Sequence, residues 1–447
     1  MTSENIPIGN EPEVENLEFT RENIEKNKQI RLVDTDEESK LELFSYINCE
    51  SKDSELVKQC RGIVFHGDQI IMKGFPFTNE FNDFDDIEEI KKNVDFDNHI
   101  FYDSYEGALI RMFYFGDKWF ISTNRKLDAF RSKWASKESF GSFFKKALQY
   151  EFEYNQRLIE HVEFNPSTDS DNVIEIFQDK VLDKKKQYMF LLLNNSENRI
   201  VCQSPINPTL YHVGTFVDHK LSIGEDVFIS HPRRHEFNNI DELLNYVSNL
   251  NYNKLQGIIV FNNENTQFKI LNKDYQYLYK ARGNEPSIKF RYLQVRMDKN
   301  ANDSLRYLYP ESCPDFEKYE NIIYSVAETI TKSYIERFIK KNYVTVPSEE
   351  FHVIRQCHSW HIENRLENKI NLHKVIEILN AQPPTNINRM IKRKILEEKE
   401  KLNPESFERS VNNNSSRINN FKKQRKEYVS ILTKKPVISQ SQISVIS

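Results

Sequence analysis

The sequence predicts an α+β protein in which a domain of antiparallel sheets and helices is followed by an all-helical domain. Segments rich in β-forming residues, separated by short turns, recur from residue 30 to about residue 280. After about residue 300, the apolar residues recur at helical spacing instead. A chain of 447 residues is long enough for two or three domains with substantial cores.

The composition excludes several classes of protein. The formal net charge is −5, so no overall positive field attracts nucleic acid, and any such binding must come from local patches. The five cysteines are widely spaced without a Cys-x-x-Cys pair, which indicates a reducing, intracellular compartment such as the cytoplasm. No apolar run is long enough to span a bilayer and the N-terminus is not a signal peptide, so no membrane partner is expected.

The first elements in chain order follow a polar N-terminus at 1–14, which is expected to be disordered. A helix and a short strand are expected within 19–50. Residues 60–72 predict a β-hairpin around a His-Gly-Asp turn, and residues 108–123 predict another around Gly116-Asp117. The acidic segment between these hairpins, 83–93, is expected to be a helix or a loop with a solvated face.

The most informative segment is 101–134, where a strand and a tight turn precede the second hairpin. The turn places Glu106 at a strand end beside Gly107, which allows another group to approach the backbone closely. The return strand brings Arg125 and Lys126 towards the same end. A carboxylate, a bare backbone and two cations at one rim indicate a pocket for a nucleotide or an RNA end. A surface hairpin with ordinary charges is the alternative.

The middle of the chain alternates between the two kinds of element. An amphipathic helix pair is expected over 128–157 and a helix over 240–250. Strands are expected at 173–177, 188–193, 199–202, from Gly257 and at 267–271. Alternating tyrosines follow, which either stack on a single nucleic-acid strand or form one face of a β-strand packed on the sheet; they are Tyr275, Tyr277 and Tyr279.

A helical domain is predicted over 305–403, with helices at 348–364, 371–380 and 385–402. Cys357 and His361 stand at ligand-like offsets, but no second ligand pair accompanies them, so no metal site is predicted. The tail at 404–447 is rich in Ser, Asn and Lys and is expected to be disordered.

Several motifs of the first domain resemble, in order and spacing over about 30–280, those of the phage-type RNA ligases. These RNA ligase 1-like proteins belong to the covalent nucleotidyltransferase superfamily. The matching segments are Cys60-Arg61-Gly62-Ile63-Val64-Phe65, residues 75–82, residues 101–123, Gln256-Gly257-Ile258-Ile259-Val260 and residues 268–272. The resemblance implies a nucleotidyltransferase domain at 15–300, with RNA or a nucleotide as partner, and ATP and Mg²⁺ as cofactors if the chain is active.

The chain departs from the family pattern at four positions. Ser104 stands where the family has its nucleophilic lysine, so the group that forms the lysyl-nucleotide adduct is missing. A serine hydroxyl cannot form that phosphoramidate and is a poor nucleophile without a nearby base. Asn79 and Leu271 replace two further lysines, and Gln256 replaces a glutamate. The binding residues that the resemblance retains, with Glu175 placed on a middle strand, are Arg61, Glu106, Gly107, Glu175 and Lys269.

Three hypotheses follow from these residues. In the first, a ligase-like protein with a degenerate catalytic centre binds a nucleotide or RNA end through the retained residues together with Arg125 and Lys126. In the second, an active ATP-dependent RNA ligase uses Lys126 as a relocated nucleophile. In the third, a scaffold keeps only the fold. Convergence of Glu106, Arg125, Lys126 and Lys269 would favour binding, and an apolar plug in the pocket would favour the scaffold.

Overall fold

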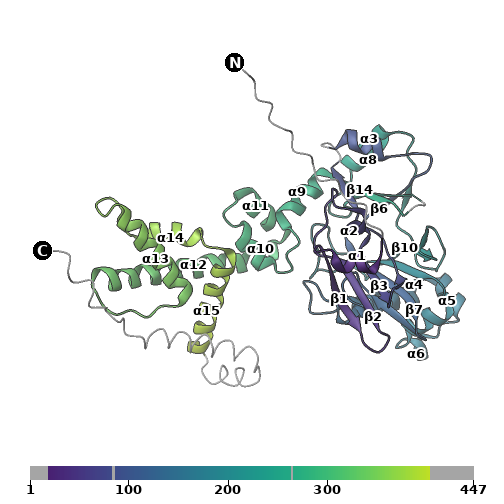
Figure 1. Cartoon of the computed structure of the whole chain (residues 1–447), viewed down its shortest axis with the longest axis horizontal. Helices are drawn as coiled ribbons and strands as arrows, with labels where there is room; N and C mark the ends of the chain where they lie inside the picture. Colours follow the sequence, from purple (N-terminus) through teal and green to yellow (C-terminus); the bar gives the residue numbers. More distant parts are fainter. Residues whose placement is uncertain (1–18, 83–85, 263–264, 403–447) are drawn as a thin grey trace, which may run out of the picture. The chain divides into compact units, whose positions relative to one another are not determined.

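The computed structural model describes residues 19–82, 86–262 and 265–402. The chain divides into two units, Met1–Pro286 and Ser287–Ser447, which we describe separately. The first unit combines sheets and helices and the second is helical in its described part, which confirms the predicted fold class (Figure 1). The predicted domain boundaries stay predictions, and the termini predicted to be disordered lie outside the described residues.

Within the described ranges, the first unit contains three sheets. The first is antiparallel and is ordered β1 (Ile30–Asp36), β2 (Leu41–Tyr46), β3 (Arg61–His66), β4 (Gln69–Met72). The second is antiparallel and is ordered β11 (Lys220–Ser222), β10 (Leu210–Val217), β9 (Gln187–Leu193), β7 (Gly107–Phe115), β8 (Lys118–Ser122). The third is ordered β12 (Arg234–His235), β6 (Ile100–Ser104), β13 (Gly257–Phe261), β14 (Gln267–Leu271), β5 (Asn79–Asn82), and only its β14–β5 pair is parallel.

The first unit also contains helices, most of which bury apolar side chains. They are α1 (Arg21–Lys26), α2 (Glu55–Gln59), α3 (Ile87–Asn93), η1 (Ala129–Arg131), α4 (Phe140–Tyr154), α5 (Gln156–Val162), α6 (Pro166–Asp169), α7 (Val173–Lys180), α8 (Ile240–Ser248) and α9 (Lys273–Arg282). One core joins α4, α5 and α7 to the second sheet, where Phe144 and Phe190 meet with ring centroids 5.8 Å apart. A separate core joins α3 and α8 to the third sheet.

The second unit packs its helices around α12, whose buried residues recur every three or four positions along 22 residues. The elements are α10 (Ile288–Val295), α11 (Lys299–Leu308), η2 (Pro310–Ser312), α12 (Cys313–Tyr334), η3 (Ile335–Ile339), α13 (Ser348–Glu363), α14 (Leu372–Asn380) and α15 (Pro384–Leu402). The three predicted helices after residue 347 are confirmed to within a few residues.

The predicted tight turn at Glu106 is wrong, because the strands on its two sides belong to different sheets. Ser104 at the end of β6 pairs with Gly257 of β13, whereas Gly107 at the start of β7 pairs with Leu193 of β9. The short segment between them therefore crosses from the third sheet to the second. A Cβ on Gly107 would lie 2.5 Å from a carbonyl oxygen of β9, so the group that approaches this glycine closely is a neighbouring strand.

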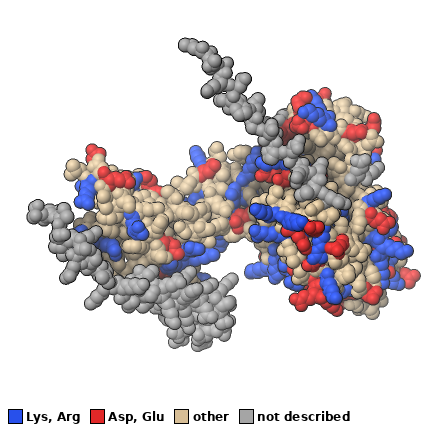
Figure 2. Space-filling view, in the orientation of Figure 1, with Lys and Arg blue, Asp and Glu red and all other residues tan. Residues whose placement is uncertain are grey.

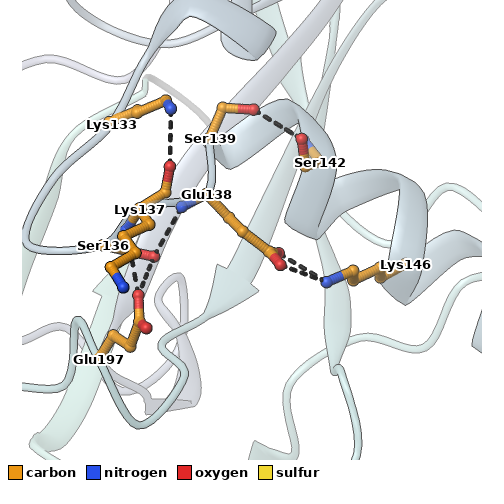
Figure 3. Close-up of polar contacts among 8 residues, drawn as sticks. All are labelled: Lys133, Ser136, Lys137, Glu138, Ser139, Ser142, Lys146 and Glu197. Atoms are coloured by element: carbon orange, nitrogen blue, oxygen red, sulfur yellow. Dashed lines mark hydrogen bonds and ion pairs between the residues drawn. The ribbon is translucent and has the colours of Figure 1, made fainter. Parts of the chain in front are cut away.

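The helix pair predicted over 128–157 begins later than expected, at the start of α4. Ser139 caps that helix by accepting a backbone N–H of its first turn at 3.2 Å. The preceding loop is held in a non-helical path by Glu197, whose Oε2 accepts the hydroxyl of Ser136 at 2.6 Å and the backbone N–H of Lys137 at 3.1 Å (Figure 3). These bonds come from a residue far along the chain, which local sequence patterns do not reveal.

Two further strand predictions are wrong, and so is the strand alternative for the alternating tyrosines. Residues 173–177 lie in α7, because Val173, Ile174 and Phe177 are buried at helical spacing against α4. Residues 199–202 form an irregular loop. The alternating tyrosines lie in α9, whose buried positions are Tyr275, Leu278, Ala281 and Arg282, while Tyr277 is exposed. These tyrosines therefore do not form one face of a β-strand, and their stacking on a nucleic-acid strand stays a prediction.

Candidate functional site

A cavity of about 310 Å³ lies in the first unit and is lined by residues of all three sheets and of the loops between them. We call it the central cavity. Its volume is at the lower end of the range of small-molecule sites. Its polar lining includes Arg61, Thr78, Asp103, Ser104, Asn124, Gln256, Gln267 and Lys269, and its apolar lining includes Phe75, Leu109, Leu191, Val213, Ile259 and Phe261. A site with an apolar wall and a few convergent polar groups suits an organic ligand with a charged end.

The structure brings only some of the predicted site residues to this cavity. Arg61, Gly107 and Lys269 line it, as does Ser104 at the position of the family nucleophile. The remaining predicted binding residues are absent from its described lining; they are Glu106, Arg125, Lys126 and Glu175.

Arg61 is a cation without an acidic partner among the described residues. Its Nη1 donates to the carbonyl of Pro76 at 3.1 Å and to Oγ1 of Thr78 at 3.3 Å. No carboxylate lies within 4.0 Å of this guanidinium in the described part of the chain. Lys269 also reaches the cavity, and its Nζ lies 3.6 Å from Oε1 of Glu80. The Arg61 charge is thus left for an anion to balance.

A second guanidinium lies behind the first and also has no acidic partner among the described residues. Arg111 of β7 is fully buried and donates to the carbonyls of Gly62 and Thr123, the latter at 2.6 Å. Burial, together with the smaller effect of the nearby Arg61 charge, lowers the pKa of Arg111 to about 9. Two neighbouring cations without counter-charges create a local positive potential beside the cavity.

Ser104 and Lys269 share one acceptor. Oε1 of Gln256 accepts from Nζ of Lys269 at 2.9 Å and from Oγ of Ser104 at 3.1 Å. Nε2 of Gln256 donates to the hydroxyl of Tyr275 at 3.0 Å, and that hydroxyl donates to Oε1 of Glu106 at 3.0 Å. In this series of hydrogen bonds each group donates to the next, from the Gln256 amide to the Tyr275 hydroxyl to the Glu106 carboxyl.

This chain of hydrogen bonds explains why an amide suits position 256. The Tyr275 hydroxyl gives its only proton to Glu106, so its oxygen needs a donor from the other side. Gln256 supplies that donor through Nε2 and still accepts through Oε1, whereas an ionised glutamate only accepts. The glutamine is therefore matched to the polar groups around it.

Glu106 is a buried structural carboxyl, which corrects its predicted place at the rim. It is 4% exposed and accepts backbone N–H groups from Val201 at 2.8 Å, Cys202 at 2.9 Å and Ile200 at 3.3 Å, besides the Tyr275 hydroxyl. Burial raises the pKa of Glu106, and these hydrogen bonds oppose the shift. Its acceptor capacity is committed to the protein.

The other predicted cations and the second acidic residue lie elsewhere. Lys126 places Nζ 3.1 Å from Oδ1 of Asp34 on β1, in an ion pair on the first sheet. Arg125 is exposed, and its guanidinium donates to the carbonyl of Ile47 at 3.4 Å. Glu175 is exposed on α7 instead of lying on a middle strand. The expected convergence of two cations with Glu106 does not occur.

Two titratable residues of the cavity were not predicted from the sequence, an aspartate and a histidine. Asp103 lines the cavity, and its Oδ1 accepts from Nε2 of His235 at 2.8 Å and from the hydroxyl of Tyr246 at 3.0 Å. His231 also lines the cavity, and its Nδ1 lies 2.9 Å from the carbonyl of His212. Asp103 directly precedes Ser104 within the segment 101–134. The histidines lie in a stretch without a recognisable motif, so the sequence alone does not indicate a role for them.

The residues present do not fit a Mg²⁺ site of the kind that the family resemblance implies. Mg²⁺ requires oxygen ligands that can turn towards it, and Glu106 is engaged by four donors while Asp103 is held by His235 and Tyr246. In the parts of the chain that the structure describes, no three His, Cys, Asp or Glu side chains are grouped to hold a metal ion. These carboxylates are therefore not suited to bind Mg²⁺ in this cavity.

Charge on the surface is mixed. Figure 2 shows Lys and Arg interspersed with Asp and Glu on the visible face of the first unit, without a broad basic region there. No helix in the described ranges combines the length and the apolar run that crossing a bilayer requires.

The sequence is similar to those of proteins from invertebrate iridescent viruses. No family model matches the chain. It is 29% identical over 403 residues to the immediate-early protein ICP-46 homolog of Invertebrate iridescent virus 6, covering 85% of this chain and 86% of that protein. It is 27% identical over 361 residues to the homolog of Invertebrate iridescent virus 3, covering 77% and 75%.

Structural neighbours include ATP-dependent DNA and RNA ligases. A putative ATP-dependent DNA ligase from Aquifex aeolicus aligns with 76% of this chain and 86% of its own, at 13% identity and a TM-score of 0.35. An archaeal ATP-dependent RNA ligase aligns with 63% of this chain and 70% of its own, at 10% identity and a TM-score of 0.34.

Proposed function

We propose that this protein binds a nucleotide, or the phosphorylated end of an RNA, in the central cavity without forming a lysyl-nucleotide adduct. The observation that carries the proposal is the pair of cations Arg61 and Arg111, neither of which has an acidic partner among the described residues. Phosphate oxygens would balance that charge through charge-assisted hydrogen bonds to Arg61. The apolar wall, with Leu109 and Leu191, suits the base.

The absence of an adduct follows from the groups around Ser104. Its Oγ donates to the amide oxygen of Gln256, and an amide is not a base that could remove the hydroxyl proton. Lys269 is the amine of the cavity, but it donates to the same amide oxygen and pairs with Glu80. Lys126, the alternative nucleophile, is paired with Asp34 outside the described lining of the cavity.

The scaffold hypothesis has less support. The cavity is open and carries Arg61 and Lys269, so apolar side chains do not plug it. Of the four side chains whose convergence would favour binding, Lys269 alone reaches the cavity, and Arg61 supplies the second cation in place of Arg125 and Lys126. The retained cations favour a binding protein.

Calorimetric titration of the full chain tests the binding proposal. ATP, GTP and a 5′-phosphorylated oligoribonucleotide serve as probes. We expect Arg61→Ala and Lys269→Met each to weaken binding about tenfold or more, since each removes a charge-assisted contact. Lys126→Met and Arg125→Ala are matched controls outside the cavity and should leave affinity unchanged. Absence of binding by the unaltered chain would establish the scaffold hypothesis instead.

A labelling experiment tests the catalytic half of the proposal. The chain is incubated with α-labelled ATP, and separately GTP, with magnesium or manganese, and then run on a denaturing gel. We expect no labelled band. A band that disappears in Lys126→Ala would show an active nucleotidyltransferase with a relocated lysine.

A further inference from the structure

A second cavity of about 250 Å³ lies in the first unit beside the central one. We call it the lysine cavity. The residues that matter for its chemistry are Lys58 and Gln59 of α2, Lys73, which follows β4, Asn79 of β5, and His219, at the turn between β10 and β11. Four separate elements thus bring two ammonium groups, an imidazole and two amides to one small volume.

Lys73 is a half-buried cation that has no acidic partner in the part of the chain that the structure describes. Its Nζ donates to Oε1 of Gln59 at 2.8 Å and lies 4.8 Å from the ring centroid of Phe19. No carboxylate within the described ranges lies within 4.0 Å of it. Burial lowers the pKa of Lys73, because its charge loses solvation without gaining a counter-charge. An anion in the cavity would supply that counter-charge.

The other charged groups of the wall are Lys58 and its partner Glu55, and the carboxylate of Glu55 opposes an anion. Nζ of Lys58 lies 3.2 Å from Oε1 of Glu55, and the two side chains are 20% and 64% exposed. Because an ion pair at the surface contributes little stability, Lys58 can turn away from Glu55 towards an anion. Oδ1 of Asn79 is buried and has no hydrogen-bond partner among the described residues. This oxygen only accepts, so it can bond a protonated phosphate oxygen, and the Asn79 amide must rotate to present Nδ2 to an ionised one.

His219 responds to the charge of Lys73. The residue sits at φ +63° in the β10–β11 turn, directly after Asp218 at φ +48°. Burial lowers the pKa of His219, and the Lys73 charge lowers it further, while Asp218 acts in the opposite direction. An anion bound between His219 and Lys73 would favour the protonated imidazole, so binding would be accompanied by proton uptake.

We propose that the lysine cavity is a binding site for phosphate oxyanions of the size of pyrophosphate or triphosphate. Lys73, Lys58 and His219 supply the positive charge, and Gln59 and Asn79 supply amides. The two cavities share Gln267, whose Nε2 donates to Thr78 Oγ1 at 2.7 Å, so they are adjacent but have different cations. The proposal does not depend on what the central cavity binds.

Calorimetric titration of the full chain with sodium pyrophosphate tests this site. We expect Lys73→Met to weaken pyrophosphate binding about tenfold or more, because it keeps the length of the side chain and removes only its charge. Lys126→Met is the matched control for lysine removal and should bind pyrophosphate as the unaltered chain does. Arg61→Ala removes the phosphate-binding cation of the central cavity, so the effect of Lys73→Met should persist when it is measured in the Arg61→Ala background. Equal affinity in Lys73→Met, or no binding by the unaltered chain, overturns the proposal.

His219→Asn provides an independent readout in case Lys73→Met folds poorly. Asparagine tolerates positive φ, so this substitution preserves the turn. The ratio of affinities between the unaltered chain and His219→Asn should be larger at pH 6 than at pH 8, since only the histidine takes up a proton and the ligand's own titration cancels. A ratio that is the same at both pH values contradicts the proposed role of His219.

Competition identifies the source of the phosphate. A 5′-phosphorylated oligoribonucleotide that displaces pyrophosphate, when its 5′-hydroxyl counterpart does not, assigns the site to a terminal phosphate of RNA. Failure of both oligonucleotides to displace it assigns the site to free oxyanions. Either result supports the site, provided that Lys73→Met weakens pyrophosphate binding as expected.

Discussion

The hydroxyl of Tyr275 donates to Oε1 of Glu106 at 3.0 Å, across 169 positions of sequence. The contact joins α9 to the crossing between the second and third sheets. It also orients the Tyr275 oxygen towards Nε2 of Gln256, which links a buried carboxyl to the wall of the central cavity. Glu106 therefore shapes the cavity without reaching it.

Glu106→Gln should destabilise the first unit by about 3 kcal/mol, because the new amide group places a donor against the backbone N–H groups that the carboxyl now accepts. Urea denaturation followed by amide hydrogen exchange in β7 and β13 would measure the change. Glu175→Gln, on the exposed face of α7, is the matched control and should change stability by less than about 0.5 kcal/mol. Equal effects of the two substitutions would show that Glu106 is not structural.

Gly257→Ala should cost about 3 kcal/mol or more, since an added Cβ would lie 2.0 Å from the backbone carbonyl oxygen of Ile270 in the paired strand β14. Backbone atoms within a sheet cannot move aside as a flexible side chain can. Gly116→Ala is the control, because no atom lies within 4 Å of its added Cβ and only its φ of +55° opposes the substitution. We expect about 1 kcal/mol there. Thermal unfolding of both variants would show the difference.

His212 should make the first unit less stable in mild acid. Burial lowers the pKa of His212 to about 4 from its ordinary 6.5, and the nearby His231 acts in the same direction. Its Nδ1 lies 3.1 Å from the carbonyl oxygen of Glu225, and its Nε2 lies 3.0 Å from the Thr215 hydroxyl and 3.1 Å from the carbonyl oxygen of Gly214. The two carbonyls favour the protonated ring, and the effect of burial exceeds theirs. The folded state therefore binds its proton only at lower pH than the unfolded chain does.

The sign and size of this effect follow from linkage. As pH falls from 6.5 towards 4, the unfolded chain takes up the proton first, so stability that is present above pH 6.5 is lost over that window. Between pH 7.5 and pH 5 the loss from this residue is about 2 kcal/mol. Hydrogen exchange in β9 and β10 at each pH, compared between the unaltered chain and His212→Gln, isolates it. A loss of equal size in His212→Gln would assign the acid sensitivity to other groups.

Local patterns in the sequence determined much of the fold. Alternating apolar residues beside Gly-Asp turns predicted the β3–β4 and β7–β8 hairpins, and helical spacing predicted α8 and the helices of the second unit. These elements depend on contacts between residues close together in sequence, so their signals are local. The position of Arg61 and Lys269 at one cavity agrees with the motif resemblance, although their binding role stays a prediction.

Contacts between distant segments decided the rest. Strands β6 and β7 are adjacent in sequence but join different sheets, and this determines that Glu106 is buried by the loop at 200–202 instead of facing a ligand. The pairing of Lys126 with Asp34 likewise depends on how the first sheet packs against the segment that follows β8. Sequence alone determined which residues could carry charge and chemistry. The tertiary structure decided which of those charges are neutralised by the protein and which remain for a ligand, because a charge pair depends on distance in space.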